Sequence, residues 1–309
     1  MQQKKVTIHA PATVANLVCG FDVLGMCIDA PFDVMEVELI NTPEVIIKNT
    51  DSYHLPTAPH LNAAGAPLLE LMLSFNKPIG FKITSNKNIK PGSGLGSSAA
   101  SAAGAVVAAN YLLGNPFSKN DLVRFAMAGE KVATGIKHAD NVAPCIYGGV
   151  TVIRSIFPLD VINIDAPPLY VTVVHPQIEI KTADARQILR KEVLLKDAIK
   201  QWGNIAGLVA GFMKKDVNLI ANSLEDVIIE PIRSILIPRF DDIKQACKNA
   251  GALGGGIAGS GPSIFMLSET KAIADTVAQV MQHTYTEIGL PHFTYVSQIN
   301  NEGVKIIQS

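Results

Sequence analysis

A glycine-rich segment constrains the fold of this chain more than any other feature. It reads Pro91-Gly-Ser-Gly-Leu-Gly-Ser-Ser-Ala-Ala-Ser101, with a glycine at every second position of its first half. Glycine adopts positive φ without strain, so such a loop can present successive backbone N–H groups to a ligand. An alanine-rich run follows as far as about Leu113, and Ser97 or Ser98 is expected to cap this helix. A glycine loop that enters a helix N-terminus predicts a phosphate-binding site.

Two better-known glycine motifs do not describe this loop. A Walker loop has a lysine directly after its last glycine, and no lysine follows these glycines. The dinucleotide motif G-x-G-x-x-G does occur, at residues 254–259. There it follows an expected helix and precedes an expected strand, which is the reverse of the order that the motif needs. The alternative for the loop is a flexible turn before a close-packed helix.

The chain as a whole has the composition of a globular protein. Its 309 residues suffice for one large or two ordinary domains, and 48% of them are hydrophobic against 17% charged. The net charge of −1 gives no support for binding to nucleic acid or to a membrane surface. A proline-punctuated connection at 155–168 is the candidate boundary, so we expect one domain at 1–160 and a second domain at 161–309.

The cysteines and the apolar runs indicate a cytoplasmic protein. All four cysteines have apolar neighbours and none forms a C-x-x-C pair, which favours buried, reduced thiols. No secretory signal is visible after Lys4 and Lys5. The longest run of small apolar residues, 99–109, is too short to span a bilayer.

Hydrophobic periodicity predicts an α+β fold with a strand-rich first half. A helix at 118–134 opens with Ser118 and Asp121 as an approximate capping box. The expected strands are 4–10, 32–40, 44–48, 79–85, 150–153, 170–174, 263–267, 292–299 and 303–307. The expected helices are 60–75, 99–113, 118–134, 182–196, 198–213, 216–226, 238–250 and 269–283.

Several polar residues stand in apolar surroundings and need partners. Asn16 and Asp22 are either turn-forming residues or ligand contacts. Glu130 lies at the edge of the apolar face of the 118–134 helix, where it can reach a cleft, and a solvated pair with a neighbouring cation is the alternative. The loop at 135–149 concentrates His138, Asp140 and Asn141, a weak metal signal by itself.

Three separated stretches together resemble the three motifs of the GHMP small-molecule kinases. They are Ala10-Pro-Ala-Thr-Val-Ala-Asn, the loop Pro91-Gly-Ser-Gly-Leu-Gly-Ser-Ser and Gly255-Gly-Ile-Ala-Gly-Ser-Gly-Pro-Ser263. The stretches at 15–25 and 138–144 look like the branch that phosphorylates the amino acid L-homoserine, a step of threonine biosynthesis. Thr13 and Val14 stand near the place where mevalonate- and galactokinase-like members usually carry a lysine or arginine.

The resemblance implies a two-domain GHMP kinase fold and a nucleotide site. The N-terminal domain would be similar to the second domain of ribosomal protein S5, the C-terminal domain would be ferredoxin-like, and ATP and Mg²⁺ would lie between them. Ser98 and Glu130 would bind Mg²⁺. The implied nucleotide-binding residues are Asn62, Pro91, Gly92, Ser93, Gly94, Leu95, Gly96, Ser97, Ser98, Ala99, Ala100 and Ser101.

The resemblance also implies a substrate site and a catalytic set. Asn16 and Asp22 would hold the amino end of homoserine, and Arg186 and Arg233 its carboxylate. The implied substrate-binding residues are Asn16, Asp22, His138, Asn141, Thr182, Arg186, Arg233 and Gly259. The implied catalytic residues are Glu130, Asp140 and Asn141. We expect Asn141 to orient the reactive hydroxyl, and Asp140 as a general base is the alternative.

Two other functions stay open on the sequence. One is a different GHMP kinase, acting on mevalonate or a related alcohol, although two arginines with Asp22 favour a zwitterionic substrate. The other is a catalytically silent GHMP-fold sensor, against which the presence of Ser98, Glu130 and all three motifs weighs. A homodimer is possible.

Overall fold

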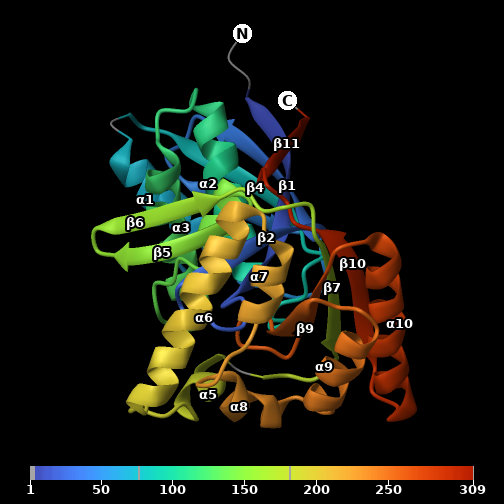
Figure 1. Ribbon diagram of the computed structural model, residues 1–309. Helices are drawn as coiled ribbons and strands as arrows, with labels where there is room; N and C mark the ends of the chain where they lie inside the picture. Colours follow the sequence, from blue (N-terminus) through green and yellow to red (C-terminus); the bar gives the residue numbers. More distant parts are fainter. Residues whose placement is uncertain (1–3, 76, 181, 309) are drawn as a thin grey trace.

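The computed structural model describes residues 4–75, 77–180 and 182–308, which form two β-sheets with helices packed against each (Figure 1). One sheet is built from strands of the first half of the chain and from the last strand. The other is built from strands that follow residue 169. Helices and strands are mixed along the whole chain, as the α+β prediction requires.

The first sheet is built around two long antiparallel strands. Its order is β11-β1-β2-β4-β3, and β5 and β6 extend it from the start of β2, at residues 24–26. β1 and β2 are both longer than predicted, because buried residues such as Thr13, Val14 and Met26 continue the pairing beyond the ranges with clear alternation. The strands are β1 (Lys5–Ala15), β2 (Leu24–Ile40), β3 (Val45–Asn49), β4 (Gly80–Asn86), β5 (Val150–Ile156), β6 (Leu159–Ile164) and β11 (Lys305–Gln308).

Helix α2 packs directly on β1 and β2 and brings the glycine-rich loop to the sheet. Gly104 allows this close contact, because a Cβ at its position would lie only 3.0 Å from Ile8 Cδ1 and 3.1 Å from Ala10 Cβ. Helices α1, α3 and α4 contact α2. The helices of this half are η1 (Pro59–Leu61), α1 (Gly65–Ser74), α2 (Ser97–Leu112), α3 (Lys119–Thr134) and α4 (Val142–Tyr147).

The second sheet has the order β10-β7-β9-β8, and its strands β7, β9 and β8 are buried on both faces, whereas the edge strand β10 is mostly part-exposed. Along β7, Val171 and Val173 join the main hydrophobic core, whereas Val174 joins a second core under α9 and α10. Side chains that alternate along a strand point to opposite faces of the sheet. Its strands are β7 (Tyr170–Pro176), β8 (Gly254–Ile257), β9 (Ile264–Ser268) and β10 (His292–Gln298).

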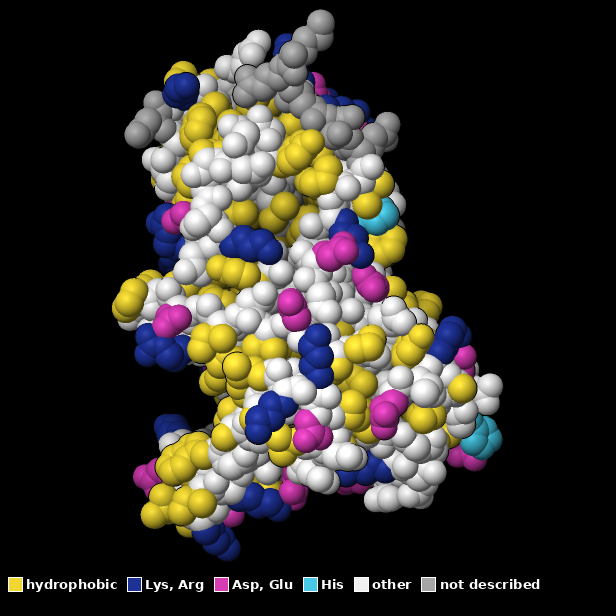
Figure 2. All heavy atoms as spheres, turned by 45° about the horizontal axis from the view of Figure 1, so that its top comes forward, with side chains coloured by type: hydrophobic (Ala, Val, Ile, Leu, Met, Phe, Trp, Pro, Cys, Tyr) yellow, Lys and Arg dark blue, Asp and Glu magenta, His cyan; other side chains and the backbone are white. Residues whose placement is uncertain are grey.

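The helices of the second half include α6 and α7, which pack against each other, and α9 and α10, which cover the outer face of the sheet. The exposed face of α6 carries Leu195, Ile199 and Trp202, and hydrophobic side chains gather at the lower left of Figure 2. Elsewhere on that view basic and acidic side chains are interspersed, in line with the net charge of −1. The helices are α5 (Thr182–Gln187), α6 (Leu195–Lys214), α7 (Val217–Ser223), α8 (Glu230–Arg233), η2 (Ser234–Leu236), α9 (Phe240–Asn249) and α10 (Lys271–Glu287).

The two halves are joined by the end of the chain. An isolated bridge between Ile28 and Ile299 links β2 to the segment after β10, and β11 then pairs antiparallel with β1. The segment 155–168, predicted as a connection, contains β6, which forms a hairpin with β5 and crosses the predicted boundary at residue 160. The domain division itself stays a prediction.

Other predicted ranges differ from the structure in identifiable ways. The helix predicted at 182–196 ends at Gln187, and α6 begins only at Leu195. The helix at 60–75 is a 3-10 turn followed by α1. The short elements α4, α8 and β8 were not predicted, because four to six residues are too few to show a periodicity.

The expectation for the cysteines is confirmed. Cys19, Cys27, Cys145 and Cys247 are buried free thiols. Burial raises the pKa of the Cys19 thiol to about 12 and that of Cys247 to about 12. Among the described residues, no helix is both long enough and apolar enough to cross a membrane.

Candidate active site

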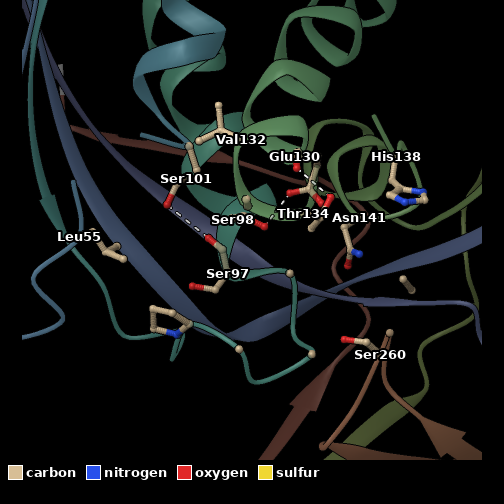
Figure 3. Close-up of a pocket in the computed structure, with 18 of the residues that line it drawn as sticks. Leu55, Ser97, Ser98, Ser101, Glu130, Val132, Thr134, His138, Asn141 and Ser260 are labelled. Carbon is tan, nitrogen blue, oxygen red and sulfur yellow. Dashed lines mark hydrogen bonds between the residues drawn. The ribbon is translucent and has the colours of Figure 1, made fainter. Parts of the chain in front are cut away.

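A cavity of about 350 Å³ lies where the glycine-rich loop, the end of α3 and the loop before α4 meet residues of the second half (Figure 3). Ser97, Ser98 and Ser101 line it from α2, and Glu130 lines it from α3. His138 and Asn141 lie at the opposite end from Leu55 in Figure 3. The cavity is therefore elongated, with one apolar end and one end rich in polar side chains.

The glycine-rich loop turns every second residue toward the cavity. Gly92, Gly94 and Gly96 have φ values of 76°, 82° and 65°, and all three line the cavity. This left-handed conformation is strained for residues with a Cβ, which explains the spacing of the glycines. At Gly94 a Cβ would also lie 2.5 Å from Ala258 O, so the loop packs tightly on the segment at 258–261.

The predicted serine cap of α2 is wrong. Gly96 occupies the N-cap position, in the left-handed conformation and without a side-chain cap. Ser97 Oγ instead donates to Ile89 O at 2.7 Å, and Ser98 Oγ donates to Glu130 Oε1 at 2.7 Å. The first N–H groups of α2 are consequently not covered by a serine cap, which leaves the helix N-terminus suited to an anion.

Glu130 is a buried carboxylate on the cavity wall. Its side chain comes from the edge of the apolar face of α3, as the periodicity predicted, and the residue is only 4% exposed. Burial raises the pKa of Glu130, and the hydrogen bond from Ser98 opposes that shift. Together, Ser98 and Glu130 place two side-chain oxygen atoms next to the glycine-rich loop.

Asn141 is held by a residue of the first motif. Thr13 Oγ1 donates to Asn141 Oδ1 at 2.7 Å, although 128 residues separate the two. A Cβ at Gly96 would come within 2.0 Å of Thr13 Oγ1 and 3.0 Å of Asn141 Oδ1, so the glycine loop passes directly over this hydrogen bond. Since the carbonyl oxygen of the Asn141 amide is engaged, its NH₂ group is the part left for a ligand.

Asp140, next to Asn141, is 5% exposed and lines the same cavity. Its burial raises the pKa of this carboxyl to about 7, and the negative charges of Asp22 and Glu130 add to the shift. A group that titrates near neutral pH can exchange a proton during a reaction. The geometry thus keeps Asp140 as a candidate base.

Oppositely charged groups meet at the polar end of the cavity. Arg186 Nη2 lies 2.8 Å from Asp22 Oδ2, and His138 Nδ1 lies 3.8 Å from Asp22 Oδ1. Burial lowers the pKa of His138, Asp22 opposes the shift and Arg186 adds to it. The guanidinium groups of Arg186 and Arg233 lie 5.3 and 4.9 Å from the centre of the Phe21 ring.

Arg233 and Asn16 converge on one carbonyl oxygen. Asn16 Nδ2 donates to Gly259 O at 2.8 Å, and Arg233 Nη1 donates to the same oxygen at 3.3 Å. Arg233 Nε also donates to Ala185 O at 3.0 Å, and the residue is 4% exposed. The backbone N–H of Asp22 donates to Asn16 Oδ1 at 3.0 Å. The late glycine segment therefore anchors the polar end of the cavity.

The apolar end contains Asn62 in a supporting position. Asn62 Nδ2 donates to Pro56 O at 2.6 Å, and Asn62 Oδ1 accepts the backbone N–H of Ala64 at 2.8 Å. Asn62 lines the cavity, but its amide shapes the loop that carries Leu55 and Pro56. Contact of this amide with a base stays a prediction.

The predicted site residues fall into three groups. Ser93, Leu95, Ala99 and Ala100 lie behind the cavity wall, because loop and helix turn alternate residues away from it. The side chain of Thr182 lies outside the described part of the structure. The remaining predicted residues line the cavity: Asn16, Asp22, Asn62, Pro91, Gly92, Gly94, Gly96, Ser97, Ser98, Ser101, Glu130, His138, Asp140, Asn141, Arg186, Arg233 and Gly259.

Lys87 is a cavity residue that the sequence patterns do not predict. It lines the cavity although it is only 6% exposed, and its Nζ donates to Ser97 O at 2.9 Å, to Ser101 Oγ at 2.8 Å and to the Asp33 carboxylate. The signal was one lysine at the end of an apolar strand, which a surface lysine would equally produce. Lys87 ties the first turn of α2 to β2.

Comparison with known proteins defines the class first. Residues 63–149 match the family model of the GHMP kinases N terminal domain, and residues 208–287 match that of the GHMP kinases C terminal. The crystal structure of L. major mevalonate kinase shares the fold, with a TM-score of 0.72 at 16% identity over 97% of this chain and 99% of its own. The chain belongs to the GHMP kinases, so the predicted two-domain fold is confirmed.

Relatives that align over the full chain identify the branch of the GHMP kinases. The chain is 46% identical to the homoserine kinase of Chloroherpeton thalassium, over 98% of this chain and all of that protein. It is 43% identical to the homoserine kinase of Chlorobaculum tepidum, over 99% of both chains. The crystal structure of the homoserine kinase from Cytophaga hutchinsonii superposes with a TM-score of 0.94 at 45% identity, covering 99% and 98% of the two chains. The chain belongs to the homoserine kinase family.

Proposed function

We propose that the protein transfers the γ-phosphoryl group of ATP to the hydroxyl of L-homoserine, which yields ADP and O-phospho-L-homoserine for amino-acid biosynthesis. One observation carries the proposal: a single cavity joins a phosphate-type glycine loop to a cluster made of Asp22, Arg186 and the buried Arg233. A zwitterionic amino acid requires such a pair of opposite charges, and arginine offers a bidentate fork to its carboxylate.

The nucleotide would lie along the cavity with its base at the apolar end. Backbone N–H groups at the start of α2 and the helix dipole favour the triphosphate. Leu55 and Pro56 offer apolar walls to the base. This orientation directs the γ-phosphate toward Asn141 and the charged cluster.

Ser98 and Glu130 would hold Mg²⁺. Both are hard oxygen ligands on the cavity wall, 2.7 Å apart. Among the described residues, no group of three or more His, Cys, Asp or Glu could hold a metal by itself. Magnesium in nucleotide sites is typically bound by one or two carboxylates together with substrate phosphates, so the two residues fit this ion. When bound, it would neutralise charge on the transferring phosphoryl group.

The residues around the reactive hydroxyl of homoserine act by orienting this hydroxyl toward the phosphorus. With its Oδ1 engaged by Thr13, Asn141 donates from Nδ2 to the hydroxyl oxygen of homoserine and aligns a lone pair with the phosphorus. An amide does not accept the proton. In a loose transition state the nucleophile gives up its proton late, to an oxygen of the transferred phosphoryl group and then to water, so strong base catalysis is not required. Asp140 as the acceptor of that proton is the alternative.

A substrate panel tests the proposal. ADP release is measured with L-homoserine, mevalonate, galactose and shikimate, and only homoserine should stimulate it. Stimulation by mevalonate alone would assign the protein to another GHMP kinase activity, and no stimulation by any of them would favour a silent sensor. We also infer a cytoplasmic enzyme, where ATP is abundant and thiols stay reduced. A homodimer stays a prediction that light scattering can test.

A further inference from the structure

The carbonyl oxygen of Ser93, in the glycine-rich loop, accepts hydrogen bonds from a residue at the start of the second sheet's strand β9. Ser263 Oγ donates to Ser93 O at 2.7 Å, and the backbone N–H of Ser263 points to the same oxygen at 3.3 Å. Ser263 directly precedes β9 and is fully buried. Neither Ser263 nor Ser93 lines the cavity, so this contact lies behind the loop.

The contact determines which way a loop N–H points. In a trans peptide unit the C=O and the following N–H point in opposite directions. With the carbonyl of Ser93 directed at Ser263, the N–H of Gly94 is directed away from it, toward the side where Gly94 lines the cavity. The Leu95–Gly96 unit, two peptide units further along, is held in the same way, because the N–H of Thr13 donates to Leu95 O at 3.2 Å.

His175 fixes the Ser263 hydroxyl. His175 Nδ1, on β7, lies 3.2 Å from Ser263 Oγ. A hydroxyl has one proton, and the shorter contact shows that it is given to Ser93 O, so Nδ1 carries a proton and donates to Ser263. His175 Nε2 is buried without a hydrogen-bond partner in the described structure. Burial, with a smaller effect of Lys90, lowers the pKa of His175 to about 4, so the ring is neutral at physiological pH.

We propose that Ser263 and His175 are positioning residues of the phosphate loop, which orient the Ser93–Gly94 peptide so that the N–H of Gly94 faces the nucleotide triphosphate. The inference rests on the proposed function, since ATP is the ligand. Both residues belong to the second half of the chain. The second sheet therefore contributes to the nucleotide site without touching the nucleotide.

The first test removes the hydroxyl. Ser263→Ala should weaken the affinity for ADP and for a non-hydrolysable ATP analogue about tenfold, the loss of one hydrogen bond in an otherwise ordered loop. The KM for homoserine should change less than twofold. Ser268→Ala is the matched control: Ser268 is equally buried on β9, and its Oγ has no partner in the described structure. This control should bind nucleotide as the wild type does.

The second test concerns the donor on His175. Asn places an N–H₂ close to the position of Nδ1, whereas Leu removes the donor. We expect His175→Asn to retain nucleotide affinity within about threefold and His175→Leu to resemble Ser263→Ala. This pair keeps the inference testable where Ser263→Ala does not fold, as judged by circular dichroism.

Calorimetric titration with ADP distinguishes a failure of the proposed function from a failure of the positioning role of Ser263 and His175. A wild-type chain that binds no ADP contradicts the proposed function. A wild-type chain that binds ADP beside a folded Ser263→Ala of equal affinity overturns this inference alone. Equal affinities of His175→Leu and His175→Asn would likewise remove His175 from the positioning role.

Discussion

Arg186 Nη2 lies 2.8 Å from Asp22 Oδ2 and 2.9 Å from Asp22 Oδ1, across 164 residues of sequence. The two groups proposed for the opposite ends of homoserine thus pair with each other. A bound amino acid would give each of them its own counter-charge, so one ion pair is exchanged for two. A plain hydroxy acid has no ammonium group and cannot make this exchange, which explains how the site can select a zwitterion.

The arginine of this pair gives the first prediction. Arg186→Met should raise the KM for homoserine about thirtyfold, since losing one partner of a charge-assisted pair costs at least about 2 kcal/mol. A cost at the lower end of the range of about 2–5 kcal/mol is expected, because the Arg186 side chain is 35% exposed. ATP affinity should stay unchanged. Arg154→Met, at an exposed ion pair with Asp160, is the control. An equal loss of ATP affinity would place Arg186 in the phosphate site.

The second prediction concerns the proposed metal ligand. Glu130→Gln keeps the shape of the side chain and its hydrogen bond from Ser98 but removes the charge. Turnover should fall by about 10²-fold or more, because a neutral amide is a poor Mg²⁺ ligand. Thermal stability should be retained or increased, since burial disfavours the ionised form. Near wild-type turnover at low Mg²⁺ would contradict the role of Glu130, and Glu225→Gln on the surface serves as control.

The third prediction separates orientation from base catalysis. Asn141→Ala should reduce kcat more than Asp140→Asn does, because the hydroxyl loses its orienting donor. A general base contributes about 10²–10⁴-fold, so an obligatory base would make Asp140→Asn nearly inactive. Measurement of kcat for both folded variants decides between them. An inactive Asp140→Asn that binds both ligands, beside a mildly impaired Asn141→Ala, would reverse the assignment.

Asp140 also gives a prediction for the pH dependence of stability. Its pKa in the folded chain, about 7, lies above that of an unfolded aspartate, near 3.8. Between about pH 4 and pH 7 the folded state binds the extra proton, so this residue's contribution to stability is present at low pH and is lost as the pH rises through 7. Asp140→Asn should match the wild type near pH 4 and exceed it by up to about 4 kcal/mol at pH 8. Urea denaturation at both pH values measures the difference, and a pH-independent difference would contradict the raised pKa.

The main features of the site could be predicted from local patterns. The alternating glycines at 92, 94 and 96 imply positive φ, and all three adopt it. The periodicity of α3 placed Glu130 at the edge of the buried face, where it reaches the cavity. The capping box of Ser118 and Asp121 formed as expected. Each of these signals depends on residues within one turn or one helix.

The rest of the site depends on contacts between distant segments. The sequence marks Thr13 only as the residue near a position where related kinases usually carry a lysine or arginine. Its hydrogen bond to Asn141 joins residues 128 positions apart, so no local pattern predicts it. Lys87 could not be told from a surface lysine, because its partner Asp33 lies on another strand. The serine cap failed because Ser97 and Ser98 found tertiary partners that compete with the helix N-terminus.

The identity of the phosphorylated product tests the central claim most directly. The purified protein is incubated with ATP, Mg²⁺ and L-homoserine, and the products are identified by ³¹P NMR and mass spectrometry. The account predicts ADP and a phosphate monoester on the side-chain hydroxyl of homoserine in equal amounts, and loss of the ester with Glu130→Gln. Inorganic phosphate in place of the ester, or an ester formed only when another alcohol replaces homoserine, would contradict it.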